Sequence, residues 1–294
     1  MSGTNVPGSL PVSFTFSGIL KLVRWPNLLM IVISQYLAAI FLIGPVSQYL
    51  NILRDLDLAF ICLGTISVAA AGYIINDYYD VKIDYINKPD RVVVGKLLKR
   101  RSAMFIHLGL NALGVVAGAL VSLKIALINF VAAIWLWGYS NQLKRMPLVG
   151  NLSVAILSGV SIAIVEIHYQ SGNSLVYIYA LFAFFISLIR EILKDIEDLK
   201  GDQTFGCKTL PVIWGTRNTK YMLLLVIVLF VLCLLQILKG IESQNIYLYF
   251  MVMIIPAIFF IYKLWIADTK RQFGQLSWFL KLLMLSGILS MTLV

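Results

Sequence analysis

The chain has 294 residues, of which 60% are hydrophobic and only 13% are charged, and its mean hydropathy is +0.88. Soluble domains usually carry about 25% charged residues, so this composition excludes a soluble globular protein. The net charge of +10 is better explained by basic cytoplasmic loops than by nucleic-acid binding, because no basic soluble domain is present to bind nucleic acid.

Apolar segments recur along the whole chain. A membrane-spanning helix needs about 20 mostly apolar residues, and the stretches that qualify are 27–46, 56–75, 103–121, 122–140, 150–170, 175–194, 220–239, 244–265 and 275–293. We therefore predict an all-α, polytopic membrane protein of about nine transmembrane helices. Residues 1–20, rich in Gly and Pro near their start, are predicted to be a flexible segment, and residues 21–294 a single transmembrane domain.

The basic residues lie mostly on one side of this predicted bundle. Of the 24 Lys and Arg residues, 20 fall in the N-terminal segment or near the loops that follow the second, fourth, sixth and eighth spans. The loops on the other side hold only Arg54, Lys124 and Lys239, while Lys281 lies inside the last span. Since Lys and Arg are concentrated in cytoplasmic loops, we expect a multi-pass protein of the cell membrane with that basic face in the cytoplasm.

The acidic residues form two groups on the same predicted face. Of 14 acidic residues, nine lie either in the predicted loop after the second span or at the end of the sixth span. The first group is Asp77, Asp80, Asp84 and Asp90, and the second is Glu191, Asp195, Glu197, Asp198 and Asp202. Ionisable residues at the mouth of a span are costly, which makes them functional candidates.

The spacing within the two groups is the same. Asp77, Asp80 and Asp84 stand at i, i+3 and i+7, as do Asp195, Asp198 and Asp202. Positions so spaced share one helix face, so each group predicts a column of three carboxylates. Mg²⁺ takes one or two carboxylates and completes its shell with water and phosphate oxygens, and two facing columns suit a two-ion clamp on a diphosphate. The alternative is a solvated face with salt bridges to nearby lysines.

Three motifs in a fixed order resemble the UbiA superfamily of intramembrane prenyltransferases: NDYYDVKID at 76–84, YSNQLKR at 139–145 and DLKGD at 198–202. The similarity includes Arg24, Asn27 and the string KPDR at 88–91, and it extends from about residue 20 to about residue 215. The last three spans match in hydropathy alone. The resemblance implies nine helices around a central cavity and Mg²⁺-dependent transfer of a prenyl group from a prenyl diphosphate to a membrane-embedded or amphipathic acceptor.

The resemblance also implies roles for individual residues. The catalytic set is Asp77, Asp80, Asp84, Asp198 and Asp202. The implied metal ligands are Asn76, Asp80, Asp84, Asp195, Asp198 and Asp202, and the implied substrate contacts are Arg24, Asn27, Arg91, Tyr139 and Lys144. Arg91 and Lys144 are the expected contacts of the diphosphate, because Arg can bind phosphate oxygens bidentately and Lys acts as a point charge.

The acceptor is indicated by one stretch of the sequence. The string REILKDIEDLKGD at 190–202, followed by Gly206, Lys208 and Thr209, is most similar to the branch that acts on geranylgeranylglyceryl phosphate. An aromatic quinone precursor is the alternative acceptor, and a membrane transporter is a second alternative function. A CDP-alcohol phosphotransferase is disfavoured because the sequence contains no DGxxAR string.

Overall fold

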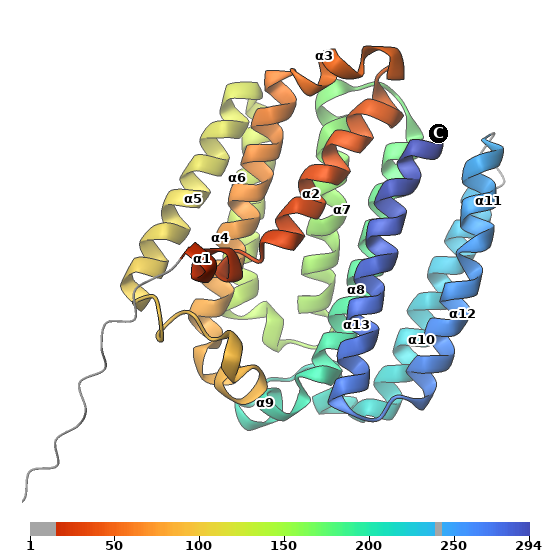
Figure 1. Ribbon diagram of the computed structural model, residues 1–294. Helices are drawn as coiled ribbons and strands as arrows, with labels where there is room; N and C mark the ends of the chain where they lie inside the picture. Colours follow the sequence, from red (N-terminus) through yellow and green to blue (C-terminus); the bar gives the residue numbers. More distant parts are fainter. Residues whose placement is uncertain (1–15, 239–242) are drawn as a thin grey trace, which may run out of the picture.

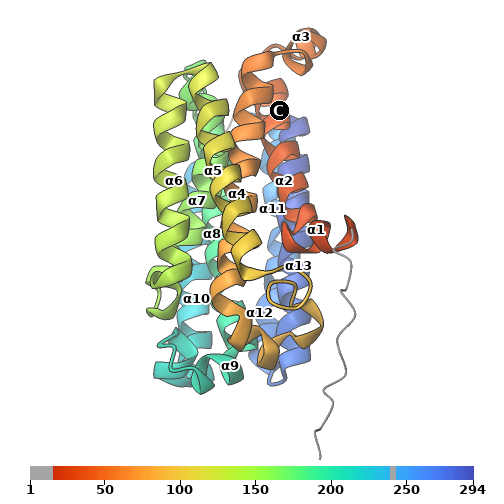
Figure 2. The same ribbon diagram turned by 90° about the vertical axis from the view of Figure 1, so that its left-hand side faces the viewer.

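A computed structural model describes residues 16–238 and 243–294 of the chain. Within those residues, nine helical segments are long and apolar enough to cross a membrane. They run side by side in a bundle, with the ordered C-terminus at the same end as the short helix α3 and with helix α9 at the opposite end (Figures 1 and 2). The predicted all-helical membrane fold with nine spans is confirmed for the described part of the chain.

The elements follow one another through short connections. In chain order they are α1 (Phe16–Leu22), α2 (Trp25–Leu37), η1 (Ala38–Ile43), η2 (Val46–Gln48), α3 (Tyr49–Leu53), α4 (Leu56–Asn87), η3 (Pro89–Arg91), α5 (Arg100–Val121), α6 (Leu123–Asn141), η4 (Leu143–Arg145), α7 (Val149–Tyr169), α8 (Ser174–Glu197), α9 (Leu199–Thr204), α10 (Leu210–Leu238), α11 (Gln244–Val252), α12 (Ile254–Ile266), α13 (Lys270–Leu289) and η5 (Ser290–Leu293). The eighth span is built from α11 and α12 together.

The start of the ordered domain differs from the expectation. Residues 1–15 of the predicted flexible segment 1–20 lie outside the described residues. Phe16–Leu22 form α1, so the predicted boundary at residue 20 falls inside a helix. Helix α1 lies across the bundle rather than along it (Figure 1), and Arg24, in the left-handed conformation with φ 52°, makes the turn into α2.

Helix α4 is much longer than the predicted second span. It has 32 residues and is therefore about 48 Å long at about 1.5 Å per residue, whereas the hydrocarbon core of a bilayer is about 30 Å thick. The prediction that Asp77, Asp80 and Asp84 lie in a loop is wrong. The apolar pattern ends near residue 75, but the helix continues to Asn87 because its backbone bonds do not depend on apolar side chains.

Small residues hold α4 close to α5 and α6. A Cβ added to Gly114 of α5 would come within 2.6 Å of Val68 in α4. The Asn129 side chain of α6 donates to the carbonyl of Gly114 at 2.8 Å. Close approach of helix backbones with a side-chain hydrogen bond between them is the usual way to join helices in a membrane, and here it fixes the helix that carries the first aspartate motif.

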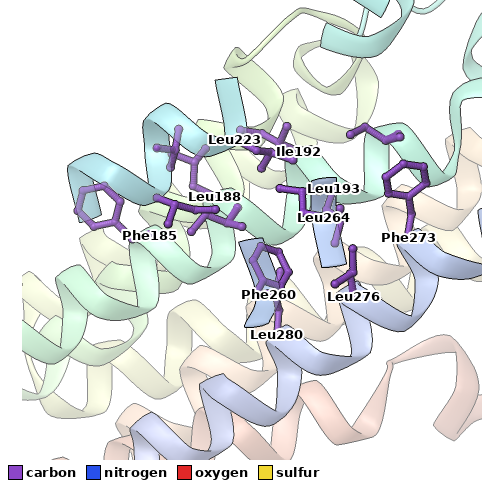
Figure 3. Packing of buried hydrophobic residues seen from close by; sticks show 14 of the residues in the cluster. Phe185, Leu188, Ile192, Leu193, Leu223, Phe260, Leu264, Phe273, Leu276 and Leu280 are labelled. Carbon is purple, nitrogen blue, oxygen red and sulfur yellow. The ribbon is translucent and has the colours of Figure 1, made fainter. Parts of the chain in front are cut away.

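Helix α8 has two distinct faces. One face packs its apolar side chains against α10, α12 and α13 in the largest buried cluster, which includes Phe185, Leu188, Ile192, Leu223, Phe260, Phe273 and Leu280 (Figure 3). The opposite face, from Tyr179 to Asp195, lines a cavity. Packing on the apolar face therefore sets the rotation of α8 and turns its polar residues inward.

Candidate active site

The predicted site residues surround a single cavity of about 640 Å³ between α2, α4, α6, α7, α8 and α13. Its lining includes all but one of them: Arg24, Asn27, Asn76, Asp77, Asp80, Asp84, Tyr139, Lys144, Asp195, Asp198 and Asp202. Arg91 is the exception, because only its backbone, in the turn η3, belongs to the described structure. The tertiary fold thus brings together residues that are up to 178 positions apart in the chain.

The first motif is organised around Lys144. The Nζ atom of Lys144 lies 2.6 Å from Oδ1 of Asp80 and 3.2 Å from Oδ1 of Asn76, and Nδ2 of Asn76 donates to Oδ2 of Asp80 at 3.0 Å. Burial lowers the pKa of Lys144, and the Asp80 carboxylate opposes that shift. A positive charge is therefore held against the first motif from η4, more than 60 residues along the chain.

Asp77 faces a different partner. Nη2 of Arg24 lies 3.0 Å from Oδ1 of Asp77, and the Arg24 guanidinium stacks 4.9 Å from the centroid of the Tyr73 ring. Asn27 donates to the hydroxyl of Tyr73 at 3.1 Å. The predicted substrate contacts Arg24 and Asn27 thus brace the start of α2 against α4.

The spacing predicted that the carboxylates of the second motif form one column on a single helix. This prediction is wrong. Asp195 lies on α8, Asp198 stands between α8 and α9, and Asp202 lies on α9. The chain turns here because the Asn87 side chain, at the end of α4, donates to the carbonyl of Asp198 at 3.0 Å and accepts from the Gly201 amide at 3.0 Å. The two motifs are joined at this point.

Each carboxylate of the second motif has its own partner. Lys88 Nζ lies 2.5 Å from Oδ2 of Asp198. Asn151 donates to Oδ2 of Asp195 at 2.8 Å, and Thr209 donates to Oδ2 of Asp202 at 3.1 Å. These contacts hold the three carboxylates in the lining of the cavity.

The donor set at the mouth fits a hard cation. Oδ1 of Asp198 is buried and has no hydrogen-bond partner within the described residues, and burial raises the pKa of Asp202 to about 6. Within the described residues, no three acidic, His or Cys side chains form a ready metal-binding group. Mg²⁺ suits such a site, because it uses one or two carboxylates together with water and phosphate oxygens.

The cavity changes character with depth. Below the carboxylates it is lined by Arg190, Glu191 and Lys194 of α8 and by Lys281 of α13. Farther from the mouth the lining includes Phe182, Met284, Gly287 and Met291, and the hydroxyls of Tyr179 and Ser290 lie 3.0 Å apart. The cavity therefore offers polar groups at one end and apolar surface at the other, as an amphiphilic ligand requires.

Sequence reasoning missed several residues of this site: Asn87, Asn151, Arg190, Lys194 and Thr209. Asn87 continues the spacing of the first motif three positions beyond Asp84. Arg190, Lys194 and Thr209 belong to the stretch that indicates the acceptor branch, but no role was predicted for them. The polar partners Asn151 and Thr209 come from α7 and from the chain just before α10, and neither position belongs to a periodic pattern that could have singled it out.

Residues 27–286 match the UbiA prenyltransferase family. The chain belongs to this family. A relative from Methanosphaera stadtmanae, named digeranylgeranylglyceryl phosphate synthase, is 33% identical over 92% of this chain and 96% of its own length. The predicted family and the predicted class of enzyme, a prenyltransferase, are therefore confirmed.

Solved structures agree with this membership of the UbiA family. A structure described as digeranylgeranylglyceryl phosphate synthase in membranes is similar with a TM-score of 0.66 and 26% identity, over 94% of this chain and 96% of that one. A UbiA homolog from Archaeoglobus fulgidus bound to GPP and Mg²⁺ has the same fold, with a TM-score of 0.66 at 17% identity, over 94% of this chain and 100% of that one. The chain is thus a multi-pass membrane protein of the UbiA fold.

Proposed function

We propose that this protein transfers a geranylgeranyl group from an allylic prenyl diphosphate to geranylgeranylglyceryl phosphate, in a Mg²⁺-dependent reaction. The acceptor is supported by the relative from Methanosphaera stadtmanae and by the similar structure described as digeranylgeranylglyceryl phosphate synthase. The use of a prenyl diphosphate and Mg²⁺ is supported by the UbiA homolog bound to GPP and Mg²⁺. An aromatic acceptor is the alternative within the same chemistry.

One observation carries the proposal. Both aspartate motifs and the cations Lys88 and Lys144 line the mouth of a cavity whose part farthest from the mouth is largely apolar. A diphosphate bound at the mouth would place its prenyl chain along apolar side chains. Carboxylates alone repel a diphosphate, so the arrangement is suited to binding one through cations.

The proposed metal ligands are those that the resemblance to the family implies, and this arrangement supports them. Asn76, Asp80 and Asp84 would hold one Mg²⁺, and Asp198 and Asp202, with Asp195 behind them, would hold a second. When bound, Mg²⁺ neutralises the negative charge that develops on the departing diphosphate. Asp77 is not among these metal ligands and is paired with Arg24; it remains in the proposed catalytic set with Asp80 and Asp84.

The protein's own side chains orient and shield the reacting groups. The bond between the allylic carbon and the diphosphate oxygen breaks, and its electron pair leaves with the diphosphate. The acceptor hydroxyl oxygen then bonds to that carbon and releases its proton. Lys144 binds diphosphate oxygens as a point charge, and Arg91 binds them through two parallel hydrogen bonds. Tyr139 lines the cavity, and the face of an aromatic ring would stabilise a developing cation; the ring of Tyr73 is stacked on Arg24.

The membrane orientation follows from the distribution of charge. Asp202 of α9 lines the mouth of the cavity, and α9 lies at one end of the bundle (Figure 1). The loops predicted at this end carry most of the Lys and Arg residues. We place this end in the cytoplasm under the positive-inside rule, so that charged substrates enter from the aqueous side.

The proposal is tested with purified protein, Mg²⁺ and radiolabelled geranylgeranyl diphosphate. Geranylgeranylglyceryl phosphate, 4-hydroxybenzoate and a naphthoate are offered separately as acceptors. We expect label to move to the glyceryl phosphate and diphosphate to be released only when Mg²⁺ is present. Transfer to an aromatic ring instead would overturn the acceptor and retain the site. Binding of the diphosphate with no transfer to any acceptor would overturn the enzymatic function.

A further inference from the structure

A cluster of charged side chains lies inside the sixth span, below the aspartate motifs. Arg190, Glu191 and Lys194 belong to α8, within the span Ser174–Glu197, and all three line the cavity. Ionisable groups within a span are costly and mark ligand sites or charge relays. Lys194 is adjacent to Asp195, but the proposed metal ligands do not account for the cluster, because Arg190 and Lys194 both pair with Glu191.

The cluster carries more positive charge than its carboxylate can neutralise. Glu191 Oε1 lies 3.0 Å from Nη1 of Arg190, and Oε2 lies 2.9 Å from Nζ of Lys194. The trio therefore keeps a net charge of +1. The neighbouring Asp195 is engaged by Asn151, and Lys281 of α13 lines the same part of the cavity.

Arg190 has a hydrogen-bond donor that is not used within the protein. Its Nε atom is buried and has no hydrogen-bond partner among the residues that the structure describes. A guanidinium offers five N–H donors in a planar fork that matches phosphate oxygens, and a buried donor without a partner is destabilising. Two partly exposed cations that line a cavity, one of them with a buried and unused donor, are suited to an anionic ligand.

The position of the cluster separates it from the diphosphate site. Lys194 and Arg190 precede Asp198 by four and eight residues, which is about 6 and 12 Å along a helix. An anion bound here would share the cavity with a diphosphate at the mouth without occupying the same place. In a glyceryl phosphate, the hydroxyl to be alkylated is on the carbon next to the one that bears the phosphate ester, so the phosphate stands only a few ångströms from the reacting oxygen.

We propose that Arg190 and Lys194 form a metal-independent subsite for the phosphate monoester of the lipid acceptor, with Glu191 as the counter-ion that holds both cations in place. This inference rests on the proposed function, because it requires an acceptor that carries a phosphate. It assigns the two negatively charged head groups to different sites: the diphosphate to the two aspartate motifs and Mg²⁺, and the acceptor phosphate to α8.

The experiment compares two acceptors, geranylgeranylglyceryl phosphate and its dephosphorylated form, geranylgeranylglycerol. In the wild-type protein we expect the phosphorylated acceptor to be preferred in kcat/KM. Arg190→Gln and Lys194→Gln should each reduce that preference about 10- to 100-fold, the equivalent of losing one charge-assisted hydrogen bond. The KM for the prenyl diphosphate and the Mg²⁺ requirement should stay unchanged.

A matched control is Arg217→Gln, because Arg217 is exposed on α10 and does not line the cavity; it should keep the wild-type preference. Arg190→Lys should restore part of the preference lost in Arg190→Gln. An unchanged preference in both Gln variants would overturn the proposal. So would an equal loss with both acceptors together with a higher KM for the diphosphate, which would assign Arg190 to the donor.

A second measurement needs no variant. Equilibrium binding of geranylgeranylglyceryl phosphate to the wild-type protein should survive in EDTA, whereas binding of geranylgeranyl diphosphate should be lost. Loss of both on metal removal would overturn the subsite, because it would place the acceptor phosphate on the metal. If the wild type alkylates only aromatic acceptors, the proposed function fails; if it alkylates the glyceryl phosphate without regard to Arg190 and Lys194, only this inference fails.

Discussion

The two aspartate motifs share a spacing in the sequence but not a local structure. The first lies on one unbroken helix, α4, which extends past the apolar layer to Asn87. The second is divided, with Asp195 on α8, Asp198 between helices and Asp202 on α9. Spacing at i, i+3 and i+7 therefore indicates a shared face only if all three residues lie on one helix. Helix α8 ends before Asp198, where Asn87 of α4 contacts the chain.

The difference has a consequence for function. The carboxylates of α4 are held by a regular helix that packs against α5 and α6. The carboxylates of the second motif depend on tertiary contacts from Asn87, Asn151 and Thr209. We therefore expect the first motif to be sensitive mainly to loss of its own carboxylates, and the second to be sensitive also to its supports.

Removing a carboxylate should have the largest effect, and it should be equal for the two motifs. Asp80→Ala and Asp198→Ala should each reduce kcat/KM roughly 1,000-fold, because the charge on the departing diphosphate loses much of its stabilisation. The measurement is diphosphate release at saturating Mg²⁺, with circular dichroism as a check on folding. Near-normal activity in both variants would contradict the site assignment.

Gly201→Ala should damage the second motif alone. A Cβ at this position would lie 2.4 Å from Nδ2 of Asn87, so the contact that turns the chain at Asp198 must shift. We expect activity to fall about 10- to 100-fold and the Mg²⁺ requirement to rise, in line with the usual effect of disturbing the supports of a metal site.

The control for that substitution is Gly274→Ala on α13, where the nearest atom to a new Cβ is Oε1 of Glu197 at 3.6 Å. Both changes raise helix propensity, so only the steric effect differs. Equal activity in the two variants would show that the contact between Asn87 and Gly201 does not govern the second motif.

Thr209→Val should have a smaller effect of the same kind. It removes the hydroxyl that donates to Asp202 at 3.1 Å while keeping the shape of the side chain. We expect the Mg²⁺ concentration for half-maximal activity to rise about tenfold. Thr204→Val, which removes an exposed hydroxyl bonded to the carbonyl of Lys200, should leave that concentration unchanged; a similar rise in both variants would exclude a specific role for Thr209.

The smallest expected effect is a pH dependence that belongs to the second motif. Burial raises the pKa of Asp202 to about 6. The raised pKa favours the neutral acid as the pH falls through 6, and the neutral acid is a poor Mg²⁺ ligand. Lowering the pH from 7.5 to 5.5 should raise the Mg²⁺ concentration for half-maximal activity about fourfold, because the ionised fraction of Asp202 falls by about that factor.

Asp202→Asn should remove this part of the pH dependence, since the amide does not titrate. The measurement is the Mg²⁺ concentration for half-maximal activity at each pH, in the wild type and in the variant. A wild-type value that is constant across this range would contradict the raised pKa of Asp202.

The sequence by itself determined the membrane class, the number of spans and the residues of the two aspartate motifs. The length of each apolar segment and the excess of Lys and Arg in alternate loops determine insertion and orientation in a bilayer without any tertiary contact. The aspartate spacing is likewise a local property of the chain. Hydropathy could not tell where α4 ends, because a helix that leaves the apolar layer keeps its backbone hydrogen bonds while its side chains become polar.

Only the tertiary structure decided how the two motifs meet. Asn87 lies more than 110 residues from both Asp198 and Gly201, and nothing in either segment specifies the other as its partner. The same holds for the pair Lys144 and Asp80, and for the inward direction of Arg190 and Lys194, which follows from the packing of the opposite face of α8. Such contacts depend on which helix faces are buried together, and that is a property of the packed bundle.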